Sequence, residues 1–235
     1  GGNGHLAACA VLKTALPEYD LKVVNPLEDI FGASDPVKTF SGGSLDGEQL
    51  YNKVIQNGWI RTANFVSRYP GAFLFRRNYR NFCKRFYAYF EKHKPDMIIS
   101  LVPFFNATAG TAAKKLSIPY LLITLDADLT FWLSDMKKCK NEDIKITVGT
   151  MTSKIKKQLA AAKIKPSNIK VVGHPIRADF FEPKDVDAIR KDWKLPNKPT
   201  AMIIRGGTGS SQLIACAKAL ANVDYPLHLL VCIGR

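Results

Sequence analysis

The chain has 235 residues, of which 46% are hydrophobic and 23% charged, which is the composition of a folded globular protein and excludes a disordered one. No apolar run approaches the roughly eighteen residues that a membrane-spanning helix needs. The formal net charge of +14 favours an anionic partner, such as nucleic acid, an anionic lipid surface or a phosphorylated substrate, without choosing among them.

The chain opens with a glycine-rich turn, residues 1–5 (GGNGH), which runs directly into a predicted helix over residues 6–16. Glycines let the backbone approach a ligand closely, and a helix start offers unpaired N–H groups and a positive dipole end. Candidate acceptor- or anion-binding residues of this turn are Gly2, Asn3 and Gly4. His5 can move a proton near neutral pH, so it is the candidate base. The alternative is a solvated tail in which His5 only caps the helix.

Extended and helical segments alternate along most of the chain. The predicted strands are residues 21–24, 96–102, 119–124, 144–148 and 169–172. Helices are predicted over residues 106–116 and 151–163, and a loop over the Gly-, Ser-, Asp- and Pro-rich residues 26–47. Strands that alternate with helices imply crossover connections and a parallel sheet. The sequence therefore predicts an α/β fold.

Residues 71–94 (GAFLFRRNYRNFCKRFYAYFEKHK) are basic and aromatic, with helical periodicity. One face would carry Phe75, Tyr79, Phe82, Phe86 and Phe90, and basic residues would lie toward another face. Three interpretations stay open: a helix whose aromatic face is core, an interfacial helix among anionic lipid headgroups, and a surface on which nucleic-acid bases stack. In the second interpretation the membrane contacts are Phe73, Phe75, Arg76, Arg77 and Arg80.

A domain boundary is predicted where prolines and a glycine punctuate residues 173–199, around a short polar helix at residues 184–193. A new strand–glycine turn–helix unit follows, with its turn at residues 205–211. Two such units in one chain suggest two nucleotide-binding-type halves. The predicted organisation is a first Rossmann-like domain at residues 1–175, a linker at 176–199 and the beginning of a second, incomplete Rossmann-like domain at 200–235.

The cysteines and histidines give no sign of a metal site. The five cysteines are widely spaced and odd in number: Cys9, Cys83, Cys139, Cys216 and Cys232. None of their pairs has metal-ligand or redox spacing, and the four histidines are equally scattered. We therefore expect reduced thiols, a cytosol-like compartment and no bound metal.

Five segments follow one another in an order that resembles a known family. They are Gly2-Asn3-Gly4-His5, residues 96–103, Leu125-Asp126-Ala127-Asp128-Leu129, residues 171–180 (VVGHPIRADF) and the glycine turn at 206–209. Together they resemble the monogalactosyldiacylglycerol synthase and processive diacylglycerol glucosyltransferase family, whose members are GT-B glycosyltransferases. This family is distantly related to the N-acetylglucosaminyltransferase of peptidoglycan lipid-intermediate synthesis. The resemblance covers nearly the whole chain, and its first and fourth segments are the most specific.

The resemblance implies transfer of a hexose from a UDP-sugar to the hydroxyl of a diacylglycerol-like lipid, with inversion and without a metal or cofactor. His5 matches the general base that removes the proton from the acceptor hydroxyl. Asp126 and Asp128 would line the acceptor side of the cleft, or else only cap a turn. The residues that match the donor diphosphate turn are Gly206, Gly207, Thr208 and Gly209. Pro175 and Arg177 match a hinge or cleft element, and His174, at its variable position, is interpreted as structural.

The expected setting is the surface of an anionic membrane, with the protein peripheral to it in a cytoplasmic-type compartment and with no nucleic-acid partner. Because the family's sugar-selecting residues would lie beyond Arg235, we expect residues 1–235 alone to be inactive. Two alternatives remain: a membrane-anchoring acceptor-side subunit that needs a separate donor-binding partner, and a nucleic-acid-binding α/β protein suggested by charge alone.

Overall fold

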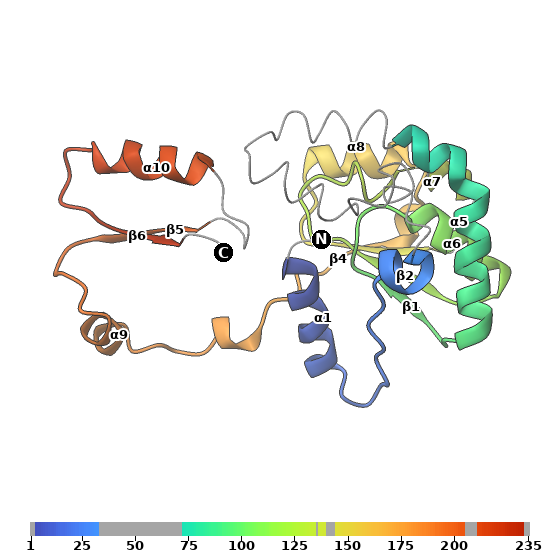
Figure 1. Cartoon of the computed structure of the whole chain (residues 1–235), viewed down its shortest axis with the longest axis horizontal. Helices are drawn as coiled ribbons and strands as arrows, with labels where there is room; N and C mark the ends of the chain where they lie inside the picture. The colour runs from blue at the N-terminus through green and yellow to red at the C-terminus, as the bar shows by residue number, and fades with distance from the viewer. Residues whose placement is uncertain (1–2, 33–71, 135, 140–143, 205–210, 233–235) are drawn as a thin grey trace.

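The computed structural model describes residues 3–32, 72–134, 136–139, 144–204 and 211–232 (Figure 1). Two lobes lie apart in Figure 1: a larger lobe, within residues 3–171, and a smaller lobe, within residues 186–232. The larger lobe has a four-stranded parallel sheet of order β1-β2-β3-β4. The smaller lobe has a parallel pair, β5-β6. The α/β class predicted from the sequence is confirmed.

The elements of the larger lobe alternate as the sequence predicts for most of its length. In chain order they are α1 (Asn3–Ala15), the π-helical turn η1 (Pro26–Phe31), α5 (Ala72–His93), β1 (Ile98–Ser100), α6 (Asn106–Lys115), β2 (Tyr120–Ile123), α7 (Met136–Cys139), β3 (Lys145–Val148), α8 (Ser153–Ala161), η4 (Pro166–Asn168) and β4 (Ile169–Val171). Helices occupy every interval between consecutive strands of this sheet, as parallel pairing requires.

The inner strands of the sheet supply the centre of the core. Leu122 of β2 pairs in register with Ile146 of β3, and their exposed fractions are 0% and 1%. The edge strand β4 is mostly exposed, with Val171 at 54%. The sheet is therefore enclosed at β2 and β3 and open to solvent at β4.

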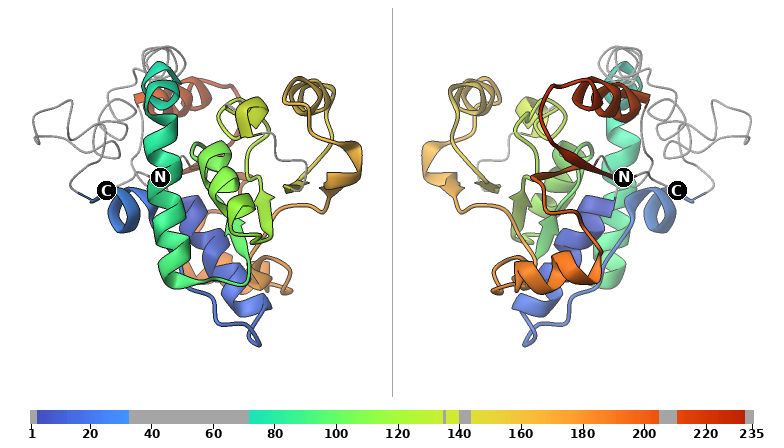
Figure 2. Two further views of the ribbon diagram at one scale, coloured as in Figure 1. Left: turned by 90° about the vertical axis from the view of Figure 1, so that its right-hand side faces the viewer. Right: turned by 90° about the vertical axis from the view of Figure 1, so that its left-hand side faces the viewer.

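Helix α5 uses its aromatic face as core. Phe82, Phe86 and Phe90 are buried, and Phe31 of η1 makes edge-to-face ring contacts with Phe82 and Phe86 at 5.0 and 5.5 Å. The helix packs on α6, which in turn packs on β2, and Figure 2 shows the long α5 at the outside of the lobe. The core interpretation of this face is therefore confirmed for these three phenylalanines.

One buried amide ties the segments around the sheet together. Asn106, at the start of α6, accepts hydrogen bonds at Oδ1 from Ser100 Oγ and Tyr120 Oη, at 2.7 and 2.9 Å. Its Nδ2 donates to the carbonyl oxygens of Val102 and Trp132, at 3.0 and 3.1 Å. A buried amide whose donors and acceptor are all satisfied holds its partners in one arrangement. This network fixes the backbone at Trp132, which lies next to the site described below.

The smaller lobe contains α9 (Val186–Asp192), β5 (Thr200–Ile204), α10 (Ser211–Ala221) and β6 (His228–Cys232), and it follows the short η5 (Ala178–Phe180). Arg190 of α9 donates to the carbonyl oxygens of Pro196 and Lys198, at 2.6 and 2.8 Å, so α9 is attached to the start of β5. The proposed division at residues 175 and 199 stays a prediction.

Two predictions for the first fifty residues need correction. Residues 21–24 pair with no strand of the described structure, because an extended β-branched run becomes a strand only beside a hydrogen-bonding partner, and here Val23 is 45% exposed. The predicted loop 26–47 begins as the helical turn η1, capped by Asn25, whose Oδ1 accepts from Leu27 N at 3.2 Å. The rest of that loop lies outside the described residues.

Candidate functional site

A pocket of about 370 Å³ lies at one edge of the larger lobe. Its lining residues are Gly4, His5, Ala8, Leu125, Asp126, His174 and Pro175. Leu125 and Asp126 follow β2, and His174 follows β4, so they lie beyond the carboxyl ends of parallel strands. Ligands of open α/β sheets bind at this edge. The first turn of α1 completes the wall.

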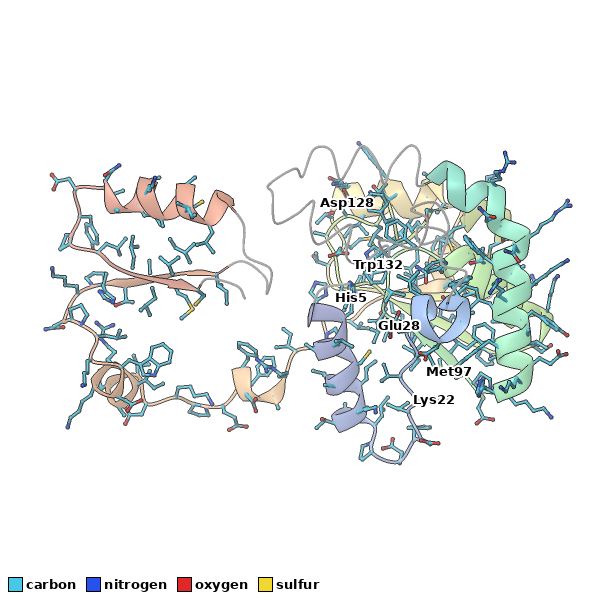
Figure 3. All side chains as sticks on the ribbon, in the orientation of Figure 1. His5, Lys22, Glu28, Met97, Asp128 and Trp132 are labelled. Carbon is cyan, nitrogen blue, oxygen red and sulfur yellow. The ribbon has the colours of Figure 1, made fainter. Side chains whose placement is uncertain are left out.

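His5 lies in the first turn of α1, half-buried in the pocket wall. Its ring centroid is 6.0 Å from that of Trp132, with a 52° angle between the planes, and Figure 3 shows the two side chains close together. The His5 Nδ1 atom is buried and has no hydrogen-bond partner among the described residues. The imidazole is thus held by packing beside the positive end of a helix, where negative charge is stabilised.

The ring that supports His5 is itself fixed at two points. Trp132 is 1% exposed, and its Nε1 donates to Asp126 Oδ2 at 2.6 Å. Its backbone oxygen accepts from the buried Asn106. A hydrogen bond between an indole and a carboxylate is charge-assisted and directional. Asp126 therefore serves as a pocket wall that anchors Trp132, and its Oδ2 is committed to the indole and not to His5.

Asp128 lies in a different environment from Asp126. Its carboxylate accepts from Thr130, from Gln158 Nε2 at 2.7 Å and from Lys154 Nζ at 2.6 Å. Partial burial alone would raise the pKa of Asp128, but these hydrogen bonds outweigh it and hold the pKa well below its ordinary value. Asp128 is not among the residues that line the pocket. Its geometry favours the capping interpretation over acceptor contact.

His174 lies in the pocket wall, although the sequence suggested only a structural role. It follows Gly173, whose φ of 81° turns the chain after β4. The imidazole rests on Gly149, the residue after β3, and a Cβ atom at position 149 would overlap the ring. The two strand ends are held together because Val172 N donates to Val148 O at 3.1 Å. A glycine beyond one strand thus makes room for a histidine beyond the next.

The remaining predicted residues divide into three groups. Pro175 and Gly4 line the pocket, and Gly4 is helical, so it does not form the open turn that the sequence suggested. Arg177 lies outside the lining and stacks over the ring of Phe180, at 5.3 Å. The structure does not describe Gly2, Gly206, Gly207, Thr208 and Gly209. It describes only the backbone of Asn3, Phe73, Phe75 and Arg76.

The exposed side of α5 carries the basic residues of the aromatic stretch. Arg77, Arg80 and Lys84 are exposed on the helix, opposite its buried phenylalanines. Within the described residues, no helix is both long enough and apolar enough to cross a bilayer. In the same part of the chain, no three His, Cys, Asp or Glu side chains gather so as to hold a metal ion.

The sequence did not single out Ala8, Leu125, Trp132 or Gly149 as parts of the site. A signal for Leu125 and Gly149 was present, because each comes directly after a predicted strand and the carboxyl ends of parallel strands meet at one edge. Trp132 had no such signal, since its role depends on the hydrogen bonds that its indole and backbone make.

No family model matches the chain. Among curated proteins, it is 32% identical over 226 residues to the processive diacylglycerol beta-glucosyltransferase of Bacillus subtilis, a match that covers 88% of this chain and 52% of that protein. The corresponding protein of Bacillus licheniformis is 25% identical over the same share of both chains. A rice protein named "Probable monogalactosyldiacylglycerol synthase 3, chloroplastic" is 29% identical over 163 residues, which is 66% of this chain and 30% of that protein.

The chain thus spans about half the length of its bacterial relatives and about a third of the rice protein. By these similarities the chain is a homologue of the monogalactosyldiacylglycerol synthases and processive diacylglycerol glucosyltransferases.

Proposed function

We propose that the complete protein is a membrane-associated, inverting glycosyltransferase that transfers a hexose from a UDP-sugar to diacylglycerol. The observation that carries this proposal is the position of His5: a half-buried imidazole in a pocket beyond the strand ends, in a chain whose relatives are named as diacylglycerol glycosyltransferases. In this proposal the larger lobe binds the lipid acceptor and the smaller lobe takes part in binding the donor.

His5 acts as the general base. Its imidazole accepts the proton of the acceptor hydroxyl while that oxygen attacks the anomeric carbon, and the bond from that carbon to the diphosphate oxygen breaks. One displacement inverts the anomeric configuration and releases UDP. In this proposal the acceptor hydroxyl binds at the start of α1, where the N–H groups of the first helical turn stabilise the negative charge that develops on its oxygen. Trp132, held by Asp126, keeps the His5 ring at the pocket wall and excludes water from its buried face.

The exposed basic side of α5 supports binding to an anionic membrane. Arg77, Arg80 and Lys84 point away from the core, and each basic residue near an anionic surface contributes about 1 kcal/mol. A helix whose other face is buried core attaches to a membrane through its charged side without inserting. This arrangement fits a peripheral enzyme whose substrate lies in the bilayer.

The test is sugar transfer by the full-length protein. Radiolabelled UDP-glucose and UDP-galactose are supplied with diacylglycerol in vesicles of phosphatidylcholine alone or with phosphatidylglycerol, and the anomeric configuration of the product is read by NMR. We expect a β-linked glycolipid and faster transfer on the anionic vesicles. Protein that binds RNA in a gel shift and makes no glycolipid would contradict the proposal and favour the nucleic-acid alternative.

Replacing His5 with Ala tests the base directly. The rate of transfer should fall by ~10² or more, because a positioned general base contributes roughly that factor or more. His93→Ala is the matched control, since it removes an exposed imidazole at the end of α5, outside the pocket lining. Thermal unfolding of both variants checks that the fold is intact. Near-normal transfer by a folded His5→Ala variant would rule out this base.

A further inference from the structure

We propose that His174 is a second substrate-contacting imidazole of the pocket and that it hydrogen-bonds an oxygen of the sugar-nucleotide donor. The inference rests on the proposed function and adds a donor contact to it. It begins with the lining of the pocket, where His174 and Asp126 join His5 as the side chains able to form hydrogen bonds.

The imidazole of His174 is available for a ligand. The residue is exposed, and its ring nitrogens have no hydrogen-bond partner within the described structure. In contrast, Oδ2 of Asp126 already accepts from the indole of Trp132. An imidazole without an intramolecular partner can donate from one nitrogen and accept at the other. Such a group suits the hydroxyls of a hexose or the oxygens of a diphosphate.

The place of His174 is built into the backbone around it. Gly149 leaves the volume that the ring occupies, and any Cβ there would overlap the imidazole. Gly173, at a φ of 81°, directs the chain into this position. The backbone hydrogen bond from Val172 N to Val148 O holds the two strand ends at fixed separation. A histidine that only filled a surface position would not need a glycine beneath its ring.

The connection of His174 to the rest of the chain indicates which substrate it contacts. His5 comes from α1, the element that the proposed function gives to the acceptor. His174 comes immediately before the segment that leads to the smaller lobe, and Figure 1 shows this segment and α1 on the same side of the larger lobe. His174 is therefore the pocket imidazole that lies nearer along the chain to the lobe that the proposed function gives to the donor. On this ground we assign His174 to the donor and His5 to the acceptor.

The experiment measures KM and kcat of variants of the full-length protein for the donor, with UDP-glucose and UDP-galactose as probes, and for diacylglycerol. His174→Ala should raise the KM for the donor or lower its kcat/KM by about tenfold, as expected for one lost hydrogen bond, and leave the KM for diacylglycerol unchanged. His174→Gln should restore part of the loss, because an amide can still form the bond. His93→Ala is the control for loss of an imidazole.

Gly149→Ala provides an independent test, because it keeps the imidazole and displaces it. We expect this variant to reproduce the donor defect of His174→Ala, and the double variant to be no worse than His174→Ala alone, since the two changes remove one interaction. Additive losses would contradict the proposal. Should Gly149→Ala fail to fold in thermal unfolding, the donor KM of the two His174 variants decides the question.

The outcomes separate this inference from the proposed function. Wild-type protein that transfers no sugar contradicts both. If wild type is active and His5→Ala is inactive, but His174→Ala lies within twofold of wild type, only the role of His174 is overturned. A change confined to the diacylglycerol KM would overturn the assignment to the donor.

Discussion

The two lobes use the same alternation of apolar strands and helices, yet only one of them builds an extensive core. The buried cluster consists entirely of residues from 31 to 162, all in the larger lobe. In the smaller lobe, among the described residues, Leu213 alone is a buried hydrophobic, while Ile204 and Ile214 are 70% and 56% exposed. Two strands and a helix do not enclose both faces of a sheet, whereas β2 and β3 have strands on both sides and α6 packs on β2.

The two lobes should differ in which residues tolerate substitution. In the larger lobe the packing that excludes water also positions the pocket, because Trp132 and Asn106 belong to both. In the smaller lobe, within the described structure, most apolar side chains neither form a buried core nor position the pocket. Stability and site geometry should therefore depend on the same residues in the larger lobe and on different ones in the smaller lobe.

An isoleucine-to-alanine substitution should destabilise the larger lobe far more than the smaller one. Ile146→Ala in β3 removes a side chain that is 1% exposed and should lower the free energy of unfolding by about 2 to 5 kcal/mol. Ile204→Ala in β5 removes a side chain that is 70% exposed and should change the free energy of unfolding by less than about 0.5 kcal/mol. Urea unfolding measures both. Equal losses would contradict the difference between the lobes.

Hydrogen exchange measures the difference in local stability between the two lobes without a mutation. Backbone amides of β3 should exchange at least about tenfold more slowly than those of β6, because local opening requires less free energy where fewer apolar contacts are broken. The strands compared are Lys145–Val148 and His228–Cys232. Mass spectrometry of residues 1–235 reads the two peptides in one experiment. Similar protection in both would mean that the lobes open as one unit.

The smallest effect is expected at Asp128, which ties its loop to α8 without entering the core. Asp128 and Lys154 are half-exposed or more, so Asp128→Asn should cost less than about 1 kcal/mol at neutral pH. Because folding lowers the pKa of this carboxyl, the unfolded state binds more protons at acid pH. The contribution is therefore complete above the ordinary aspartate pKa of about 3.9 and is lost as the pH falls below it.

Urea unfolding of wild type and Asp128→Asn across this pH range measures the difference between them. The difference in free energy of unfolding between the two proteins should shrink as the pH falls. A difference that grows would contradict a pKa of Asp128 that is lowered by folding. Asp126→Asn is the useful comparison, since its carboxylate accepts from an indole and has no cationic partner among the described residues.

Much of the fold of the larger lobe could be predicted from local patterns. Residues 119–124, 144–148 and 169–172 were predicted as strands and contain β2, β3 and β4. The failures occurred where a pattern needed a distant partner. Residues 21–24 have strand composition without a strand beside them, and Phe31 lies in a segment of loop composition yet is 2% exposed, because α5 provides aromatic rings around it.

The candidate site was predicted only in part. The sequence indicated His5, because a histidine behind glycines at a helix start has a local chemical meaning. It gave Asp126 and Asp128 the same role, and the structure separates them: one lines the pocket and anchors Trp132, and the other is held by Lys154. Two carboxylates in one motif cannot be distinguished before their hydrogen-bond partners are known.

By itself the sequence determined the alternation of strands and helices, the parallel sheet and the position of an imidazole at a helix start, because periodicity and helix-start chemistry act over a few neighbouring residues. Tertiary structure alone decided that positions 5, 126, 149 and 174 converge. Their meeting depends on the order β2-β3-β4 and on the register of these strands, which bring the carboxyl ends of distant segments to one edge. Pairing between strands far apart in the chain supplies that information, and no local pattern contains it.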